Sequence, residues 1–290
     1  MRKSYLQLHS GVMLLGLSGI FGKLVDLNEG LITWYRVVFS AILLFALLMW
    51  KGINYSLTVK EIWKIGQPGL VMAASWLLFF ASIKYSNVSI AVVCYCAVSF
   101  FTAILAPLIN KKRIIWSELA LGMLTVIGIS LIFKFDVSYR FGIVLGVLAP
   151  VFAATYTIYN ERLVRHYNSR LLTFYQMIVG ALALVIVLPV YFLQYDSIQW
   201  MPTLWDVINL VLLALLCTVV AYVLLSEALK KISAFTVNLT LNLEPLYAIS
   251  IAFVFFGEAE ELNMGFYLGL ILVVISVLTQ SFLALKYNRH

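Results

Sequence analysis

The chain has 290 residues, of which 63% are hydrophobic and 11% are charged, and its mean hydropathy is +1.00. Soluble domains carry about 45–50% apolar and roughly 25% charged residues, so this composition excludes a soluble globular protein and indicates one that is embedded in lipid. A formal net charge of +7 would suggest nucleic-acid binding in a soluble protein, but in a membrane protein it indicates basic cytoplasmic loops, so we expect the lipid bilayer and no nucleic acid as a partner.

Ten apolar runs are long enough to cross a bilayer as helices, because a spanning helix needs about 20 residues. The first follows Arg2 and Lys3, and we interpret it as a retained span rather than a cleaved signal peptide. Short connections join the runs, which cover approximately residues 8–26, 30–50, 65–83, 89–109, 115–134, 141–160, 171–192, 206–225, 234–256 and 264–284. The sequence therefore predicts an all-α integral membrane protein with ten transmembrane helices.

The distribution of lysine and arginine predicts the orientation of these spans. With the N-terminus inside, most basic loop residues lie on the cytoplasmic side, and only Lys84, Lys134 and Arg140 lie outside. Since cytoplasmic loops are enriched in Lys and Arg, we expect a multi-pass protein with both termini in the cytoplasm.

The first run carries Lys23 close to its outer end. The side chain could extend to the outer headgroups, as long cationic side chains do, or it could lie beside the outer mouth of a central cavity. Gly16, Gly19 and Lys23 fall broadly on one helix face, which predicts that this face points into the protein.

The second run contains a single charge, Arg36, roughly 10 Å from the start of its helix at about 1.5 Å per residue. An arginine in the middle of a membrane helix costs at least ~2.5 kcal/mol unless it faces a wet cavity or a partner. Two interpretations stay open: Arg36 attracts a substrate carboxylate, or it ties the helix to neighbouring carbonyl groups.

Aromatic side chains recur inside the spans and are candidates for the wall of a substrate cavity. Such walls, with a few polar groups, are typical of small-molecule sites. The alternative for each residue is ordinary packing or contact with lipid. Ser99 is also a candidate for the cavity wall, because it shares a helix face with Tyr95. The aromatic candidates are Trp34, Tyr35, Trp76, Phe79, Tyr95, Tyr156 and Tyr175.

The three cysteines, Cys94, Cys96 and Cys217, all lie in apolar runs. The first two point to different helix faces, so we interpret all three as small core residues rather than disulfides or metal ligands. We expect no metal and no cofactor.

The two halves of the chain repeat each other. LITWYR (31–36) matches LLTFYQ (171–176), ASIKYSNVSIAVVCYCAVSFF (81–101) matches EALKKISAFTVNLTLNLEPLY (227–247), and ELALGMLTVIGISLI (118–132) matches GFYLGLILVVISVLT (265–279). Five spans in each half give the second half the opposite orientation, so we predict two inverted five-helix repeats, residues 1–138 and 139–290. Gln176 occupies the position of Arg36, which predicts a polar residue facing the interior from each half.

The ninth run contains the polar residues Asn238 and Asn242, four positions apart on one helix face, and then Glu244 and Pro245. The asparagines could bind substrate or join helices. Glu244 lies near the middle of the membrane, where Pro245 removes a backbone donor and favours a kink. Glu244 could therefore carry protons or cap freed backbone groups.

Motifs in both halves of the chain resemble those of the EamA family of the drug/metabolite transporter superfamily. The resemblance rests on Ala228-Leu229-Lys230, Glu244-Pro245, Gly257-Glu258 and Gly269 in the second half, and on GLSGIFGKLV (16–25) and WYR (34–36) in the first. It covers nearly the whole chain and implies ten helices, two inverted repeats and movement of small metabolites, often outward, in a bacterial inner membrane. The first half departs from the pattern, since Val98-Ser99 stand where the second half has Glu244-Pro245.

We therefore expect a secondary transporter that exports small metabolites, amino acids or related carboxylate-bearing compounds among them, across the cell inner membrane. Alternating access between the repeats would expose one central site to each side in turn. No Walker A sequence is present, so the chain encodes no ATP-driven step. One chain contains both repeats, so a monomer suffices, with a dimer as the alternative state.

The alternative functions are a membrane-embedded enzyme and an uptake carrier. A membrane-embedded enzyme acting on a lipid or isoprenoid would need clustered carboxylates or histidines near one interface, whereas the acids here are scattered. We therefore expect no enzyme. An uptake carrier for sugar-like compounds is compatible with the same ten-span architecture.

Overall fold

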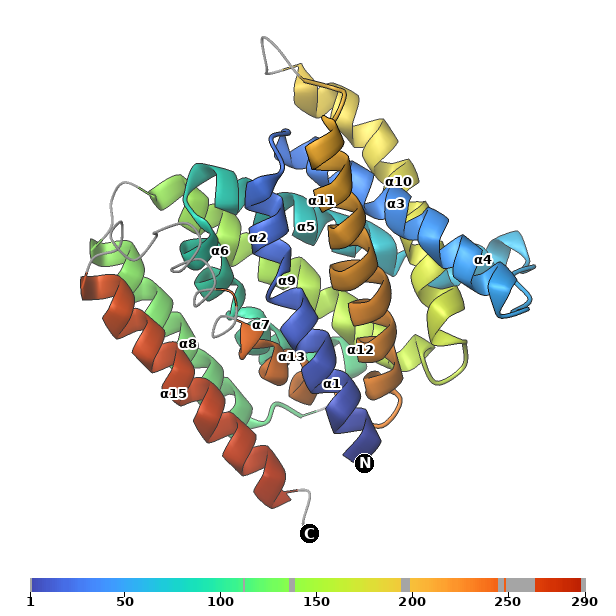
Figure 1. The fold of residues 1–290 in the computed structure, drawn as a ribbon. Helices are drawn as coiled ribbons and strands as arrows, with labels where there is room; N and C mark the ends of the chain where they lie inside the picture. The colour runs from blue at the N-terminus through green and yellow to red at the C-terminus, as the bar shows by residue number, and fades with distance from the viewer. Residues whose placement is uncertain are drawn as a thin grey trace.

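The structure is a computed structural model, and it describes residues 2–111, 113–135, 139–193, 199–244, 248 and 264–287. In these ranges all regular secondary structure is helical (Figure 1). The first half comprises α1 (Arg2–Leu15), α2 (Ser18–Leu24), α3 (Glu29–Trp50), α4 (Val59–Gly66), α5 (Pro68–Tyr85), α6 (Val88–Tyr95), α7 (Val98–Asn110) and α8 (Trp116–Phe135).

The second half has a similar succession of helices. It comprises α9 (Arg140–Leu163), α10 (Ser169–Phe192), α11 (Leu204–Ala214), the π-helix η1 (Leu215–Val220), α12 (Ala221–Leu229), α13 (Ala234–Leu241) and α15 (Met264–Tyr287). The π-helix lies within one continuous helical segment, residues 204–229, between α11 and α12. Pro245, Gly257, Glu258 and the acidic residues that follow lie outside the described residues.

Six helical segments in the described ranges are long and apolar enough to cross a membrane, and two shorter apolar helices lie within α8 and α15. The six are Glu29–Trp50, Val59–Tyr85, Val88–Asn110, Arg140–Leu163, Ser169–Phe192 and Leu204–Leu229. The chain is therefore a multi-pass membrane protein, while the count of ten spans stays a prediction. Three expected helices are interrupted: α1 and α2 meet at Gly16 and Leu17, α6 and α7 at Cys96 and Ala97, and α13 ends at Leu241.

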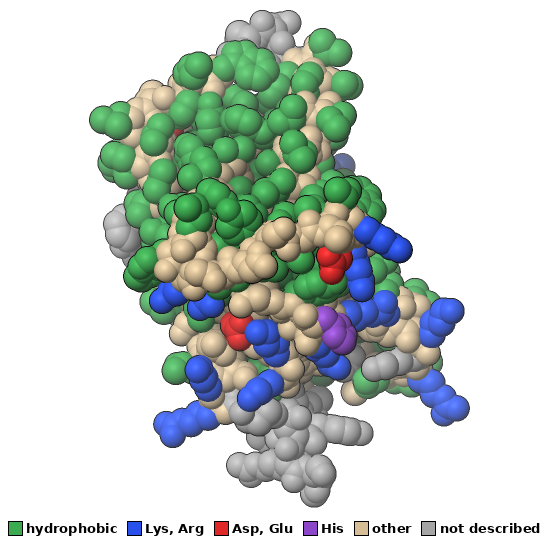
Figure 2. All heavy atoms as spheres, turned by 90° about the vertical axis from the view of Figure 1, so that its right-hand side faces the viewer, with side chains coloured by type: hydrophobic (Ala, Val, Ile, Leu, Met, Phe, Trp, Pro, Cys, Tyr) green, Lys and Arg blue, Asp and Glu red, His purple; other side chains and the backbone are tan. Residues whose placement is uncertain are grey.

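The surface has the distribution of side chains that a bilayer requires. Figure 2 shows hydrophobic side chains over the upper part of one face and Lys and Arg gathered below them, towards the end where α1 begins. On α10 the apolar side chains of Leu182, Ile186 and Val190 are 60%, 75% and 70% exposed, as expected for side chains in contact with lipid.

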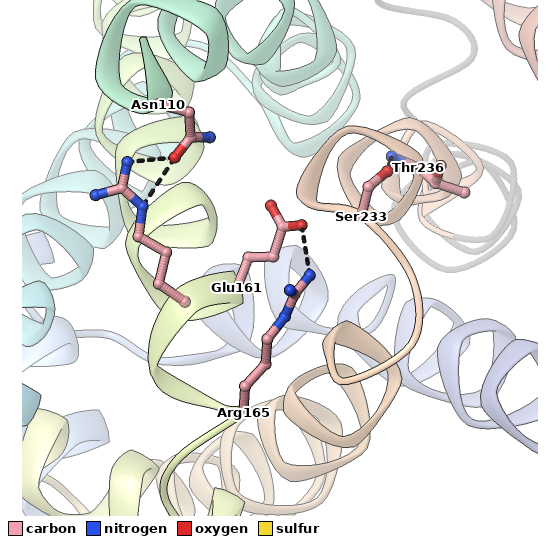
Figure 3. A network of polar contacts seen from close by, with 6 residues as sticks. Asn110, Glu161, Arg165, Ser233 and Thr236 are labelled. Carbon is pink, nitrogen blue, oxygen red and sulfur yellow. Dashed lines mark hydrogen bonds and ion pairs between the residues drawn. The ribbon is translucent and has the colours of Figure 1, made fainter. Parts of the chain in front are cut away.

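Polar contacts join helices at the basic end of the molecule. Arg162, near the end of α9, donates from Nη2 to the Ile109 carbonyl oxygen and from Nε to Asn110 Oδ1, both at 2.8 Å, and so satisfies the C-terminal end of α7. Figure 3 shows Asn110, the neighbouring pair Glu161–Arg165, and Ser233 with Thr236 at the start of α13. This end therefore brings together parts of both halves.

Helices α5 and α10 approach each other closely at Gly69 of α5. A Cβ added there would overlap the Gln176 carbonyl oxygen of α10 and lie 2.7 Å from the carbonyl carbon. Gly180, one turn along α10, faces the Gly69 carbonyl in the same contact. Small residues allow membrane helices to approach in this way, and here the contact positions the helix that carries Gln176.

Gly69→Ala is expected to destabilise the protein, because the added methyl group meets backbone atoms that cannot rotate away. Overpacking of this kind costs about 1–3 kcal/mol. The measurement is the Tm of the detergent-purified protein. Gly11→Ala is the matched control, since its new Cβ would meet mainly the Leu225 side chain, 3.2 Å away, which can shift. Equal Tm values for the two variants would contradict a rigid contact at Gly69.

Candidate functional site

A small internal cavity of about 40 Å³ lies between the two halves of the chain. Helices α1, α2, α3, α5 and α6 contribute from the first half, and α9, α12 and α13 contribute from the second. Its lining combines aromatic, polar and apolar side chains with two charged ones: Leu15, Ser18, Arg36, Met72, Trp76, Phe79, Tyr95, Ala153, Tyr156, Thr157, Asn160, Tyr222, Leu225, Ser226, Leu229, Val237, Leu241 and Glu244. This is the composition expected of a site for a small polar molecule.

Arg36 is 1% exposed and holds its position through three hydrogen bonds. Its Nε donates to Thr218 Oγ1 at 2.8 Å, Nη1 donates to Ser18 Oγ at 3.0 Å, and Nη2 donates to the Cys217 carbonyl oxygen at 3.0 Å. The acceptors belong to α2 and η1, so Arg36 joins both halves of the chain. None of them carries a charge, and the guanidinium charge therefore stays uncompensated by these bonds.

The π-helix explains why a backbone carbonyl is available to Arg36. A π-helical turn shifts the hydrogen-bond register, and such turns occur frequently at functional sites. Thr218 donates to the Leu213 carbonyl oxygen five residues earlier, at 3.4 Å, which leaves its lone pairs to accept from Arg36. The irregular turn thus supplies two neutral acceptors in the interior of the membrane.

Aromatic rings complete the surroundings of the guanidinium. Arg36 Cζ lies 4.0 Å from the centroid of the Trp76 ring and 5.6 Å from that of Phe80, in cation–π geometry. Trp76 Nε1 donates to the Tyr222 hydroxyl at 3.1 Å, so the indole is held in place from α12. These contacts stabilise a buried cation without neutralising it.

Glu244 lines the same cavity and is 6% exposed. Within the described part of the chain, no hydrogen bond or ion pair reaches its carboxylate, and none joins it to Arg36. A buried charge without an ion pair is costly, so the cavity holds one side chain of each sign that a ligand could satisfy. The prediction that Glu244 caps freed backbone groups has no supporting contact among the described residues.

Gln176, the counterpart of Arg36, does not line the cavity but contacts residues that do. Its Nε2 donates to Asn160 Oδ1 at 2.9 Å, and its Oε1 accepts from the Tyr156 hydroxyl at 3.0 Å. Asn160 Nδ2 donates in turn to the Tyr156 hydroxyl at 3.1 Å, which closes a ring of three bonds. Gln176 therefore orients two lining residues, Tyr156 and Asn160, rather than facing the cavity itself.

Asn238 and Asn242 join helices instead of lining the cavity. Asn238 Nδ2 donates to Thr102 Oγ1 at 2.7 Å, and Asn242 Nδ2 donates to Ser99 Oγ at 2.8 Å, so both bonds connect α13 or its end to α7. Ser99 is thus also part of this contact. Of the two interpretations of the asparagines, the contacts favour the joining of helices.

The remaining candidates occupy other places. Trp34 and Tyr35 line a separate apolar groove of about 310 Å³ with residues of α10 and with Trp200 and Met201. Tyr175 donates its hydroxyl to the Tyr55 carbonyl oxygen. Lys23 lies in the last turn of α2 and is absent from the cavity lining, and Pro245 is outside the described residues.

Of the predicted candidates, the structure thus brings six together around one cavity: Arg36, Trp76, Phe79, Tyr95, Tyr156 and Glu244. Ser18, Tyr222 and Ser226 also line it but were not predicted, because an isolated hydroxyl in an apolar run has no distinctive pattern. Thr218 was missed for the same reason. Over the described ranges, no group of three or more His, Cys, Asp or Glu could hold a metal ion.

Comparison with known proteins places the chain in a family. The model of the EamA-like transporter family matches residues 2–134 and again residues 140–282. An uncharacterized transporter of Haemophilus influenzae is 26% identical over 86% of this chain and 84% of its own length, and one of Clostridium kluyveri is 22% identical over 95% and 92%. The uncharacterized transporter YyaM of Bacillus subtilis is 24% identical over 93% and 92%.

A crystal structure of a protein with 14% sequence identity has a TM-score of 0.71 and covers 99% of both chains, which supports the fold alone. The family match spans both halves of the chain and confirms the resemblance drawn from its motifs. The protein is a membrane transporter of the EamA family.

Proposed function

We propose that the protein is a secondary transporter that moves small carboxylate-bearing metabolites, amino acids among them, outward across the cytoplasmic membrane. One observation carries this proposal: Arg36 and Glu244 line a single buried cavity without an ion pair between them in the part of the chain described. A zwitterion could place its carboxylate at Arg36 and its ammonium group at Glu244, and so offset the cost of two buried charges. A neutral sugar-like substrate would leave both charges unpaired.

The size of the cavity supports a mechanism with moving halves. Its volume of about 40 Å³ is far below the roughly 300–1,000 Å³ of ligand pockets, so the substrate requires the lining helices to separate. The lining residues come from both halves, and we propose that each half moves relative to the other as an inverted repeat. The substrate gradient, the membrane potential or protons would supply the energy.

The proposed orientation places both termini in the cytoplasm. Lys and Arg gather towards the end of the molecule where α1 begins (Figures 1 and 2), and basic residues favour the cytoplasmic side of a membrane. The outward direction rests on the family's frequent role in export. Because one chain contains both repeats, a monomer would suffice for transport.

The test is a mass-spectrometric comparison of culture media from cells that express the wild type or Arg36→Ala at matched membrane levels. A carboxylate-bearing metabolite enriched outside only with the wild type is the expected result, because Arg36→Ala removes the cationic side of the cavity. Identical profiles would contradict export. Uptake and counterflow in proteoliposomes would then decide whether the protein carries the same class of substrate inward.

A further inference from the structure

The repeated hexapeptides place a tyrosine directly before each polar counterpart: Tyr35 precedes Arg36 in α3, and Tyr175 precedes Gln176 in α10. Neighbouring helix residues point about 100° apart, so these tyrosines face away from the residues that follow them. Both tyrosines were expected in the cavity wall, and neither lines it.

Helices α3 and α10 pack side by side in opposite directions. Gly30 at the start of α3 lies against Leu188 and Phe192 near the end of α10. Further along, Phe45 of α3 stacks on Phe174 near the start of α10, with ring centroids 5.9 Å apart. The repeated motif near the start of each helix therefore lies at opposite ends of the pair (Figure 1).

Each tyrosine donates to a backbone carbonyl in a segment beyond the end of the other helix. The Tyr35 hydroxyl donates to the Trp200 carbonyl oxygen at 3.0 Å, in the segment that leads into α11. The Tyr175 hydroxyl donates to the Tyr55 carbonyl oxygen, in the segment that leads into α4. The two hydrogen bonds are thus reciprocal, and each connects one half of the chain to the other.

The acceptor segments carry exposed aromatic side chains, as expected at the level of the lipid headgroups. The side chains of Trp200 and Tyr55 are 53% and 43% exposed, whereas that of Tyr175 is 8% exposed. The first bond borders the apolar groove formed by Leu31, Trp34 and Phe192 with Trp200. Tyrosine suits this level of a membrane because its ring is apolar and its hydroxyl reaches polar groups.

Each tyrosine bond is coupled to the cavity through the helix backbone, because the residue after the tyrosine, Arg36 or Gln176, belongs to the polar network around the cavity. Movement of Tyr35 carries Arg36 and its bonds to α2 and η1. Movement of Tyr175 carries Gln176 and, through it, Tyr156 and Asn160. A change at either end of the α3–α10 pair therefore reaches one side of the cavity first.

We propose that Tyr35 and Tyr175 are a reciprocal pair of gating residues, one at each membrane face. Each hydrogen bond holds its own face closed and keeps the following residue, Arg36 or Gln176, in its closed position. The inference rests on the proposed transport function but adds a division of roles: release of the Tyr175 bond opens the face that carries the termini, and release of the Tyr35 bond opens the opposite face.

The test uses Tyr35→Phe and Tyr175→Phe, which remove only the donor hydroxyl. Accessibility is measured by the rate at which a soluble maleimide labels a reporter cysteine in the full-length, detergent-purified protein. The reporters are Leu229→Cys, at the end of α12 towards the termini, and Leu27→Cys, between α2 and α3 at the opposite end; the native side chains are 2% and 4% exposed. The native cysteines are buried and give the background rate.

Tyr175→Phe is expected to speed labelling of Leu229→Cys about 2- to 10-fold and to leave labelling of Leu27→Cys unchanged. Tyr35→Phe is expected to speed labelling of Leu27→Cys by the same factor and to leave labelling of Leu229→Cys unchanged. The size of the effect follows from the loss of one hydrogen bond in each variant. Tyr159→Phe, on the exposed face of α9, is the matched control and should change neither rate. A rise at both reporters in one variant would indicate general loosening and overturn the proposal, as would unchanged rates in both variants.

This result is independent of the substrate, because labelling requires no transport. Failure of the export assay together with opposite labelling shifts would refute the proposed function and leave the gating roles standing. Normal export together with unshifted labelling would refute the gating roles and leave the proposed function standing. A mere structural role for the tyrosines would lower the Tm without the opposite response of the two reporters.

Discussion

Arg36→Gln is expected to reduce transport about 10- to 100-fold while the protein still inserts and folds. Hydrogen bonds from a charged donor contribute about 1.5–3 kcal/mol, and each 1.4 kcal/mol corresponds to a factor of ten in an equilibrium constant. Glutamine keeps two N–H donors for Thr218 or the Cys217 carbonyl but cannot attract a carboxylate. Gln176, at the matching place in α10, shows that this position accommodates a glutamine within a polar network.

The measurement is initial transport rate at matched membrane level, with Lys23→Gln as the control that removes a cation from the first half outside the cavity. Arg36→Lys adds a second comparison, because it keeps the charge but loses the planar donor group that reaches three acceptors. Unchanged transport in Arg36→Gln, with a lowered Tm, would assign Arg36 to the joining of α2, α3 and η1 alone.

The position of Arg36 could be predicted because a lone charge in an apolar run has few tolerable surroundings. Its interior location followed from the cost of exposing it to lipid, and the structure places it at 1% exposure in the central cavity. The six apolar spans were readable for the same reason: hydrocarbon accepts only long, nearly uncharged helices.

The aromatic candidates were over-predicted. Trp34 and Tyr35 adjoin Arg36 in sequence, but successive helix residues point about 100° apart, so the three cannot all face one narrow cavity. The structure turns the two aromatic residues towards a groove beside α10. Helical geometry alone could have separated these neighbours before the structure was known.

Other features could not be read from sequence because they depend on distant partners. Thr218 and Cys217 are about 180 residues from Arg36 and meet it only through the π-helix, for which their sequence has no signal. Asn238 and Asn242 were predicted to share a helix face, either to bind substrate or to join helices. Their hydrogen bonds to Thr102 and Ser99 on α7 favour the joining of helices, and these partners could not be identified from the sequence.

Glu244→Gln is expected to abolish the pH-dependent part of net transport and to weaken exchange of substrate across the membrane without abolishing it, because the amide oxygen can still accept a hydrogen bond from the ammonium group of the substrate. A carboxamide has nearly the same shape as the carboxylate but cannot release and rebind a proton during the transport cycle. The charged or titratable side chains that line the cavity with Glu244 are Arg36, Tyr95, Tyr156 and Tyr222. Among these groups Glu244 is the carboxylate, and no hydrogen bond or ion pair from the described residues reaches it.

The two activities are measured separately in proteoliposomes, net transport with an imposed pH gradient and exchange with substrate on both sides at equal pH. Glu29→Gln is the matched control, because Glu29 is a buried carboxylate, 3% exposed, at the start of α3 and away from the cavity lining. Loss of both activities with a lowered Tm would make Glu244 a structural residue. Retention of pH-dependent transport would exclude Glu244 as the proton carrier and leave it only the role of holding the ammonium group of the substrate opposite Arg36.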